Sequence, residues 1–137
     1  MTVCKPRATR RQQTGLWGEG EAERYLKARG YAVLGRRFRI GPRDEIDLIC
    51  RVRDTLVFVE VKTRANEDFG RPAAAVNRRK QHRLARAAMR YLKRLKSQPA
   101  GFRFDVVEVV GGPQDCPKPA IRHIENAFPL PEYFRVP

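Results

Sequence analysis

The sequence predicts an α/β fold in which helices flank a mixed β-sheet built around a central hairpin. Two short apolar runs, residues 46–52 and 55–62, are separated by a polar turn centred on Arg53-Asp54. Each run is apolar at both odd and even positions, which is typical of strands that are buried on both faces. The chain before and after these two runs shows apolar residues at helical spacing. The resulting order of helix, three strands, helix and strand indicates helices packed against a mixed sheet.

Local signals set the bounds of the elements. Thr14 is the predicted N-cap of a helix over residues 15–29, and Gly30 is expected to end it at the C′ position. The other elements are predicted as follows: strands at 31–40, 46–52 and 55–62, a polar loop at 63–70, a helix at 72–96 that starts at a proline, a strand at 102–110, a Gly/Pro-rich loop at 111–119, and a short last strand or turn at 121–128.

The chain of 137 residues is long enough for one domain with its own core. We expect a basic flexible tail at residues 1–13, a single domain at 14–128 and an irregular C-terminal tail at 129–137. No internal repeat or linker divides the chain.

A net charge of +14 is the feature of the composition that bears most on function. A charge of this size indicates a polyanionic partner, with nucleic acid as the first candidate and an anionic membrane as the second. No apolar run approaches the roughly 20 residues that span a bilayer, and no basic helix carries a bulky aromatic face, so we expect no membrane partner. No secretory signal is visible, and we expect a cytoplasmic protein.

The cysteines give no sign of a metal site. Cys4, Cys50 and Cys116 are widely spaced and form no CxxC pair, so a structural zinc site is not expected. Free thiols agree with a reducing cytoplasm. Cys50 is expected to be a small core residue in a strand.

The second predicted helix carries the densest positive charge, and no acidic residue occurs between Asp68 and Asp105. At about 100° per residue, two stripes separate on this helix. The packing stripe contains Leu84, Ala88, Tyr91, Leu92 and Leu95, and the outward stripe contains Arg79, Arg83, Arg86, Arg90 and Arg94. A stripe of one sign repels itself, unlike the mixed i,i+4 pairs of an ordinary solvated helix. It therefore indicates contact with the phosphates of a nucleic-acid backbone.

Two acids and a lysine are predicted to meet on one face of the hairpin. Side chains alternate along a strand, so Glu60 and Lys62 share a face with Phe58. If the turn is symmetric about its central pair, Asp47 lies directly opposite Glu60, with Cβ atoms roughly 5 Å apart. Like charges at that distance repel unless a cation lies between them, and burial strengthens the repulsion. The pattern predicts a magnesium or manganese site with an ammonium group beside it.

Glu19 lies at helical spacing from Leu16, Ala22 and Leu26, on the predicted packing face of the first helix. An unpaired carboxylate is costly to bury, so two interpretations stay open. The side chain reaches the surface or meets an arginine, or it points along the sheet toward the metal. Glu23 lies near the same face and is the alternative residue.

A series of short motifs runs along residues 14–128. They are Gly18-Glu19 with Ala22 and Tyr25-Leu26, Glu45-Ile46-Asp47-Leu48-Ile49, Phe58-Val59-Glu60-Val61-Lys62 with Arg64, Phe69-Gly70, Ala75-Val76, Lys80-Gln81, Ala87-Ala88, Tyr91-Leu92, Phe104-Asp105-Val106 and Asn126-Ala127-Phe128. In this order they resemble the PD-(D/E)XK nuclease superfamily and, more narrowly, the YraN-type family of bacterial endonuclease-like proteins. The resemblance implies a restriction-endonuclease-like fold close to archaeal Holliday junction resolvases.

By position, the resemblance implies four catalytic residues, which are Glu19, Asp47, Glu60 and Lys62. The implied metal ligands are Asp47, Glu60, the backbone carbonyl of Val61, and Glu19 directly or through water. Lys62 would orient or help to deprotonate the attacking water, and Gln81 matches a helical position that some superfamily members use near the site. Two residues depart from the family pattern. Asp44 stands where glycine is usual and adds charge beside the site, and Arg37 stands where asparagine is usual.

We therefore expect a nuclease that uses magnesium or manganese to hydrolyse phosphodiester bonds, with DNA favoured over RNA. The resemblance to resolvases suggests branched or structured DNA and a homodimer. The residues expected to bind nucleic acid are Arg36, Arg37, Arg39, Arg64, Arg79, Lys80, Arg83, Arg86, Arg90 and Arg94. Two alternatives stay open, a non-catalytic nucleic-acid-binding module and an RNA- or ribosome-associated accessory protein. Salt-sensitive binding is expected of all three.

Overall fold

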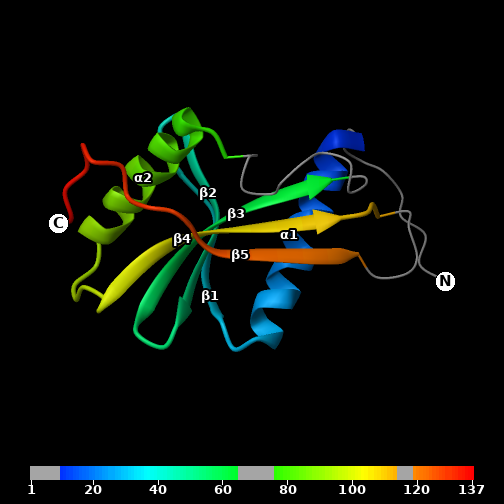
Figure 1. Ribbon diagram of the computed structural model, residues 1–137, viewed down its shortest axis with the longest axis horizontal. Coiled ribbons are helices and arrows are strands. Elements are labelled where there is room, and N and C mark those ends of the chain that lie inside the picture. Colours follow the sequence, from blue (N-terminus) through cyan, green and yellow to red (C-terminus); the bar gives the residue numbers. More distant parts are fainter. Residues whose placement is uncertain (1–9, 65–75, 114–118) are drawn as a thin grey trace.

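The structure is a computed structural model that describes residues 10–64, 76–113 and 119–137. These ranges contain α1 (Arg10–Ala28), β1 (Ala32–Ile40), β2 (Asp44–Val52), β3 (Thr55–Arg64), α2 (Arg78–Lys93), β4 (Gly101–Val110) and β5 (Ala120–Phe128). The strands form one sheet in the order β1-β2-β3-β4-β5, with α2 toward the left and α1 toward the right of it in Figure 1. The predicted α/β fold, a mixed sheet flanked by helices, is confirmed. In the described ranges, neither helix is long and apolar enough to cross a membrane.

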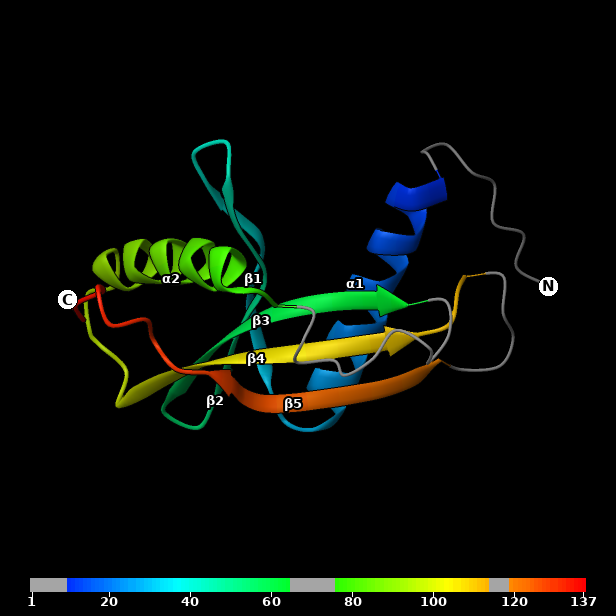
Figure 2. The same ribbon diagram turned by 45° about the horizontal axis from the view of Figure 1, so that its top comes forward.

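The sheet is mixed because β3 and β4 run parallel, whereas the other neighbouring strands are antiparallel. β2 and β3 form the predicted hairpin, in which Val52 pairs with Thr55 across the turn Arg53-Asp54. The φ of 55° at Arg53 is the left-handed conformation typical of tight hairpin turns. Parallel neighbours need a long crossover, and the connection from β3 to β4 contains α2. Figure 2 shows β1 and β2 running steeply across the direction of the other strands, so the sheet is strongly twisted.

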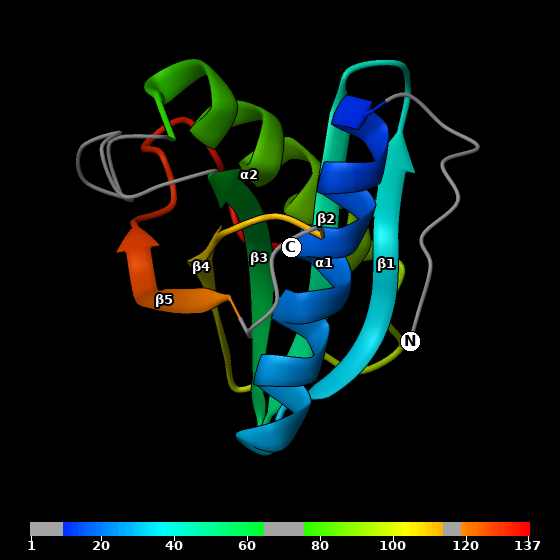
Figure 3. The same cartoon turned by 90° about the vertical axis from the view of Figure 1, so that its right-hand side faces the viewer.

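The two helices cover opposite faces of the sheet, and each buries its own apolar cluster. On β3, Val57 and Val59 belong to the cluster beneath α1, whereas Leu56 and Phe58 belong to the cluster beneath α2. The helices contribute Ala22 and Leu26 from α1, and Leu84, Ala88 and Leu92 from α2. Figure 3 shows α1 in the foreground and α2 beyond it. Because strand residues alternate between faces, the hairpin is buried on both sides, as predicted.

α1 is longer than predicted. It begins at Arg10 rather than at residue 15, so Thr14 lies inside the helix and is not its N-cap. The two arginines and two glutamines that precede Thr14 are good helix formers, and nothing in them stops the helix earlier. The other end agrees closely with the prediction, because α1 ends at Ala28 and Gly30 follows with a φ of 90°. Residues 1–9 of the expected tail lie outside the described residues.

α2 is shorter than predicted at both ends. It begins at Arg78, six residues after the expected start. The backbone of Asn77 is extended, and its side-chain oxygen accepts the N–H of Lys80 at 2.9 Å, so Asn77 is the N-cap. The proline expected at the start lies outside the described residues. The helix ends at Lys93, three residues earlier than expected.

The C-terminal part of the chain packs on the α2 side. Of the two alternatives predicted for residues 121–128, a short strand or a turn, the strand is confirmed, and β5 pairs antiparallel with β4. Residues 129–137 form no regular helix or strand, as predicted. They are nevertheless anchored, because Leu130 and Phe134 pack against the apolar cluster beneath α2.

Of the three cysteines, the structure describes Cys50, while Cys4 and Cys116 lie outside the described residues. Cys50 is fully buried in β2, as predicted. Burial raises the pKa of its thiol to about 12, so the side chain acts as a small apolar core residue.

A buried polar network joins β4 to β5 beneath α1. The Asp105 side chain accepts hydrogen bonds from Arg103 Nε at 3.0 Å and from the Asn126 N–H at 2.9 Å, and His123 Nε2 lies 2.7 Å from its other oxygen. The Tyr31 hydroxyl accepts a further bond from Arg103 at 2.7 Å. Burial alone would raise the pKa of Asp105, but these partners hold it below its ordinary value. The carboxylate is therefore a charged anchor inside the sheet.

Replacing Asp105 with alanine is expected to lower the free energy of unfolding by about 3 kcal/mol or more, because buried donors lose their acceptor. Urea denaturation at neutral pH measures the loss. Glu21→Ala is the matched control, since it removes an exposed ion pair with Arg24 and should cost no more than about 0.5 kcal/mol. Equal losses in the two variants would show that the network does not hold the sheet together.

Candidate functional site

The two predicted acids lie where β2 leaves β3. The pairing of these strands keeps the predicted register as far as Leu48–Val59, so Asp47 and Glu60 are the next residues on either side. Alternation on β2 fails at this point, because Ile46 lies in the cluster beneath α2 and Leu48 in the cluster beneath α1. Local twisting of β2 about its own axis explains why Ile46 and Leu48 face opposite sides of the sheet. The same twist opens a space between β2 and β3.

Asp47 and Glu60 share a pocket of about 200 Å³ in this space. Its lining also includes Arg43 and Glu45 near the start of β2, and Lys80, Arg83 and Leu84 of α2. The Oδ2 atom of Asp47 accepts the backbone N–H of Val61 at 2.8 Å, which directs the carboxylate across the gap toward β3. The structure therefore brings the two acids together on the side of the sheet that α2 covers.

The environment of Asp47 favours its protonated form when no cation is present. Burial and the neighbouring Glu60 carboxylate raise the pKa of Asp47 to about 8, and Glu19 adds to the shift. The hydrogen bond from Val61 acts in the opposite direction but is outweighed. Two carboxylates that share a desolvated space cannot both ionise freely. A cation that entered the pocket would displace a proton.

Two lysines supply positive charge beside Glu60. The Nζ atom of Lys62 lies 3.4 Å from Glu60 Oε2, and Lys80 of α2 contacts the same oxygen. Burial and the nearby Lys80 lower the pKa of Lys62. Burial acts in the same way on Lys80, but the Glu60 charge outweighs it and raises the pKa. Lys80 is therefore the charged partner of Glu60, and Lys62 gives up its proton more readily.

Lys80, which is expected to bind a nucleic-acid backbone, contacts Glu60 in the structure, and its binding to a backbone stays a prediction. Its side chain points to Glu60 because α2 starts at Arg78 and places Lys80 in its first turn, over the acids. The predicted helix started six residues earlier, so it did not place Lys80 in a first turn beside Glu60.

Glu19 meets an arginine, which is one of the two outcomes considered for it. Its Oε1 atom accepts a hydrogen bond from Arg37 Nε at 2.8 Å. It belongs to α1 on the opposite face of the sheet and is not in the lining of the acid pocket, although its charge reaches Asp47. Its role as a metal ligand stays a prediction. Glu23, the alternative, is paired with Arg36 at 2.6 Å.

Three other residues singled out in the sequence, Gln81, Asp44 and Arg37, have roles in the local structure. The side chain of Gln81 donates to the carbonyl of Val76 at 3.0 Å, so it stabilises the start of α2. Asp44 does not add free charge to the acid pocket, because it forms a bidentate pair with Arg86 at 3.0 and 3.1 Å. Arg37 has a φ of 47°, a left-handed conformation that asparagine tolerates better than arginine. That preference is a physical reason for the asparagine usual at this position in the resembled family.

Several arginines expected to bind nucleic acid are already engaged by carboxylates. The pairs are Arg36–Glu23, Arg37–Glu19, Arg39–Glu45 and Arg86–Asp44, with Arg64 beside the buried Glu108. Arg79 and Arg90 are exposed on α2, and Arg94 lies over the ring of Phe38. Nucleic-acid binding by these residues stays a prediction. A paired arginine must exchange a carboxylate for a phosphate, so unpaired ones are the stronger candidates.

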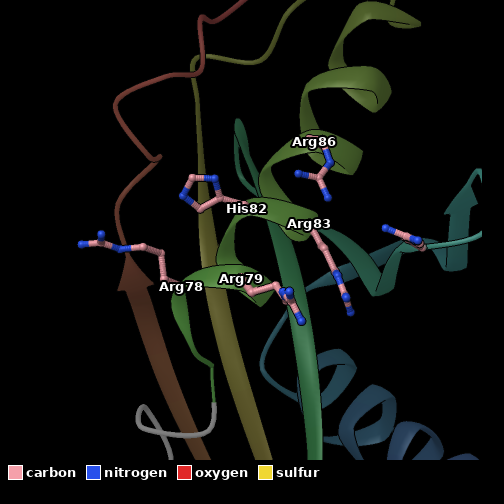
Figure 4. Close-up of a pocket in the computed structure, with 6 residues that line it drawn as sticks. Arg78, Arg79, His82, Arg83 and Arg86 are labelled. Carbon is pink, nitrogen blue, oxygen red and sulfur yellow. The ribbon is translucent and has the colours of Figure 1, made fainter.

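A second pocket, the basic pocket, adjoins the acids. It has a volume of about 830 Å³, and its described lining consists of Arg43, Arg78, Arg79, His82, Arg83 and Arg86 (Figure 4). Arg43 and Arg83 also line the acid pocket, so the two spaces are neighbours. Sequence reasoning missed Arg43, Arg78 and His82. Arg43 follows β1 in the chain and comes near α2 only in the folded protein.

The donor set of the acid pocket fits a hard cation that keeps most of its water. Asp47 and Glu60 supply carboxylate oxygens, and Mg²⁺ typically takes one or two carboxylates together with water and substrate oxygens. Across the described part of the chain, no three acidic, histidine or cysteine side chains are grouped to hold a metal. The raised pKa of Asp47 is the observation that marks the pair as short of positive charge. The Val61 carbonyl and Glu19 stay predicted additional ligands.

The fold and the site together define an α/β protein with a paired-carboxylate pocket beside a basic surface. Residues 18–109 match the family described as Uncharacterised protein family UPF0102, and the chain belongs to this family. The matched segment extends from α1 into β4, so it contains both acids, both lysines and the whole of α2.

Relatives of the family match most of the chain. The UPF0102 protein STH1475 of Symbiobacterium thermophilum is 49% identical over 119 residues, which are 85% of this chain and 97% of that protein. A UPF0102 protein of Desulfosudis oleivorans is 43% identical and covers 86% of this chain and 91% of its own length. A UPF0102 protein of Syntrophomonas wolfei is 44% identical, and the match covers 85% of this chain and 98% of that protein.

Replacing Asp47 with asparagine is expected to stabilise the metal-free protein at pH 8. A raised pKa in the folded state means that stability is lost as the pH rises from about 4, the ordinary pKa of aspartate, toward about 8. Asparagine can keep the hydrogen bond to Val61 without the charge. Denaturation in chelator should therefore show a gain of at least about 1 kcal/mol at pH 8 that is absent at pH 4.

The control for this variant is Asp54→Asn at the exposed turn of the hairpin, where the same chemical change should have little effect at either pH. If Asp47→Asn instead lost stability at pH 8, the carboxylate would be ionised and well compensated by its neighbours.

Replacing Gly18 with alanine is expected to destabilise the protein by about 1–3 kcal/mol, because a Cβ atom there would lie 3.1 Å from Thr63 Cβ and overlap its hydroxyl group. Gly20→Ala is the control, since it meets nothing within 4 Å and should stabilise α1 by about 0.5–1 kcal/mol. Thr63→Ala should restore part of the loss in Gly18→Ala. Thermal unfolding of the two single glycine variants and of the double variant measures the pattern, and equal effects at the two glycines would refute close packing of α1 on β3.

Proposed function

We propose that this protein is a metal-dependent nuclease that hydrolyses phosphodiester bonds in DNA. The observation that carries the proposal is the convergence of Asp47 and Glu60 in one pocket, with Lys62 beside them. A fold can carry many activities, so the site and not the sheet supports this function.

Each residue of the site has a distinct role in the proposal. Asp47 and Glu60 would hold Mg²⁺ or Mn²⁺, which when bound stabilises developing negative charge on the phosphate and acidifies a water molecule. Lys62 would orient the attacking water and accept its proton, and a lowered pKa suits that role. Lys80 would leave Glu60 and turn its charge toward the phosphate as the cation enters.

Membership of the PD-(D/E)XK superfamily is part of the same proposal. It is supported by acids on two antiparallel strands, a lysine two residues after the second acid, and a parallel neighbour on the other side of β3. Branched DNA as the substrate and a homodimer as the active form stay proposals drawn from the resemblance to resolvases.

The second candidate is a non-catalytic nucleic-acid-binding module, and a specific observation favours it. Lys62 and Lys80 both contact Glu60, so the acid is neutralised without a metal. If the lysines held that position in solution, the basic surface would bind nucleic acid and the acids would only anchor α2.

A cleavage assay separates the two candidates. The purified protein is offered supercoiled, single-stranded and four-way-junction DNA, and RNA, with Mg²⁺, Mn²⁺ or chelator. We expect metal-dependent cleavage of DNA that falls at least about 100-fold in Asp47→Ala and Glu60→Ala, because both charge partners of the metal are needed. Lys62→Ala should bind DNA nearly normally and cut slowly.

The control is Asp54→Ala, which removes an exposed carboxylate at the far turn of the hairpin and should cut at the wild-type rate. Equal cleavage by wild type and Asp47→Ala would indicate a contaminating nuclease. Tight binding without cleavage under every condition would favour the non-catalytic module.

A further inference from the structure

The basic pocket concentrates positive charge that no carboxylate of the described residues compensates with an ion pair, apart from Asp44 at Arg86. Among the residues that the structure describes, Arg43, Arg78, Arg79 and Arg83 form no ion pair with a carboxylate. This distinguishes them from the paired arginines of β1 and from Arg86, which is held by Asp44. Uncompensated guanidinium groups that converge on one space indicate an anion that comes from outside the protein.

The position of these arginines on α2 strengthens the inference. Arg78 and Arg79 occupy the first turn of the helix, and that turn contains no acidic residue. The N-terminal end of a helix carries partial positive charge, so cations there lower helix stability. The same end attracts phosphate groups. The arrangement therefore lowers the stability of the free protein and favours a phosphate-bearing ligand.

The ligand of the basic pocket must also approach the acids. Arg43 and Arg83 line both pockets, and the basic pocket is about four times larger, at 830 Å³ against 200 Å³. A nucleic-acid backbone that entered the larger space would pass these two arginines before it reached Asp47 and Glu60. One strand could then contact both pockets.

An exposed aromatic ring stands beside the same pocket. The Tyr133 side chain is 85% exposed, and its ring centroid lies 6.2 Å from that of His82, which lines the pocket. The segment is held in place, because the neighbouring Phe134 packs on the core and its N–H donates to the carbonyl of Pro131 at 3.1 Å. An anchored, exposed ring next to a basic groove is the arrangement on which proteins stack the bases of a single strand.

The ring has a consequence for the kind of nucleic acid. In a duplex each base is already stacked between its neighbours, so a tyrosine at the surface gains no base contact. In an unpaired strand the faces of the bases are accessible, and stacking is independent of sequence. The combination of phosphate pocket and ring therefore favours an unpaired strand over a duplex.

We propose that the start of α2 is a binding site for an unpaired nucleic-acid strand, with backbone phosphates in the basic pocket and a base stacked on Tyr133. The proposal builds on the proposed nuclease function, because it places the strand beside Asp47 and Glu60. The bond to be cut then lies next to a single-stranded segment, as at a flap, a gap or an open branch.

Binding experiments in chelator test this without requiring cleavage. The fluorescence anisotropy of a labelled oligothymidine and of a labelled blunt-ended duplex with the same number of phosphates is measured as protein is added. Tyr133→Ala should weaken binding of the single strand about tenfold and change duplex binding less than twofold. Tyr133→Phe keeps the ring and should restore most of the affinity. Since Tyr133 is exposed, neither variant should alter folding, and circular dichroism checks this.

A double variant tests the pocket. Arg79→Ala combined with Arg83→Ala should weaken binding of both ligands, and it should lower the number of counterions released on single-strand binding by about one to two. Lys93→Ala is the matched control, because it removes one exposed positive charge from the same helix about 20 Å further along. The control should leave single-strand binding within twofold of wild type.

Three results would overturn the proposal. The first is an unchanged single-strand affinity in Tyr133→Ala, and the second is an equal loss of duplex affinity in the same variant. The third is competition by a deoxynucleoside triphosphate at the same concentration of phosphate as the oligonucleotide, which would mark a mononucleotide site. Absence of cleavage with the Tyr133 effect intact would instead contradict the nuclease and leave the strand-binding site in place.

Discussion

The electrostatic repulsion between Asp47 and Glu60 is the constraint around which this part of the molecule is arranged. The two carboxylates come from adjacent strands and share a small, largely desolvated space. Three groups offset the repulsion: the Val61 N–H on Asp47, and the ammonium groups of Lys62 and Lys80 on Glu60. Without the divergence of β2 from β3 after Leu48–Val59, there would be no space for these partners.

The same principle explains how the large positive charge is distributed. Arginines of β1 are matched one to one with glutamates of α1 and β2, as in Arg36–Glu23 and Arg39–Glu45. These pairs tie α1 and the edge of the sheet together and leave little free charge there. The excess collects instead at the start of α2, where the basic pocket touches the acids. The basic pocket and the carboxylate site are thus neighbouring parts of one surface.

The hairpin could be predicted with accuracy from the sequence, and the helices less so. In residues 46–52 and 55–62, both odd- and even-numbered positions are apolar, which indicates strands buried on two faces. The polar Arg53-Asp54 turn between them sets the register of their pairing. The start of α1 was misplaced because a threonine that resembles a cap lies among good helix formers. The start of α2 was misplaced because the prediction placed it at a proline, whereas Asn77 caps the helix by accepting the N–H of Lys80.

The sequence by itself determined the two-faced hairpin, the proximity of Asp47, Glu60 and Lys62, and the basic stripe of α2, because strand and helix periods act over a few residues. The tertiary structure decided which charges meet. Glu19 turned to Arg37, Lys80 turned to Glu60, and Tyr133 came to lie beside His82. These contacts join residues of different elements, and their geometry depends on the twist of the sheet and the exact starts of the helices, which no local pattern specifies.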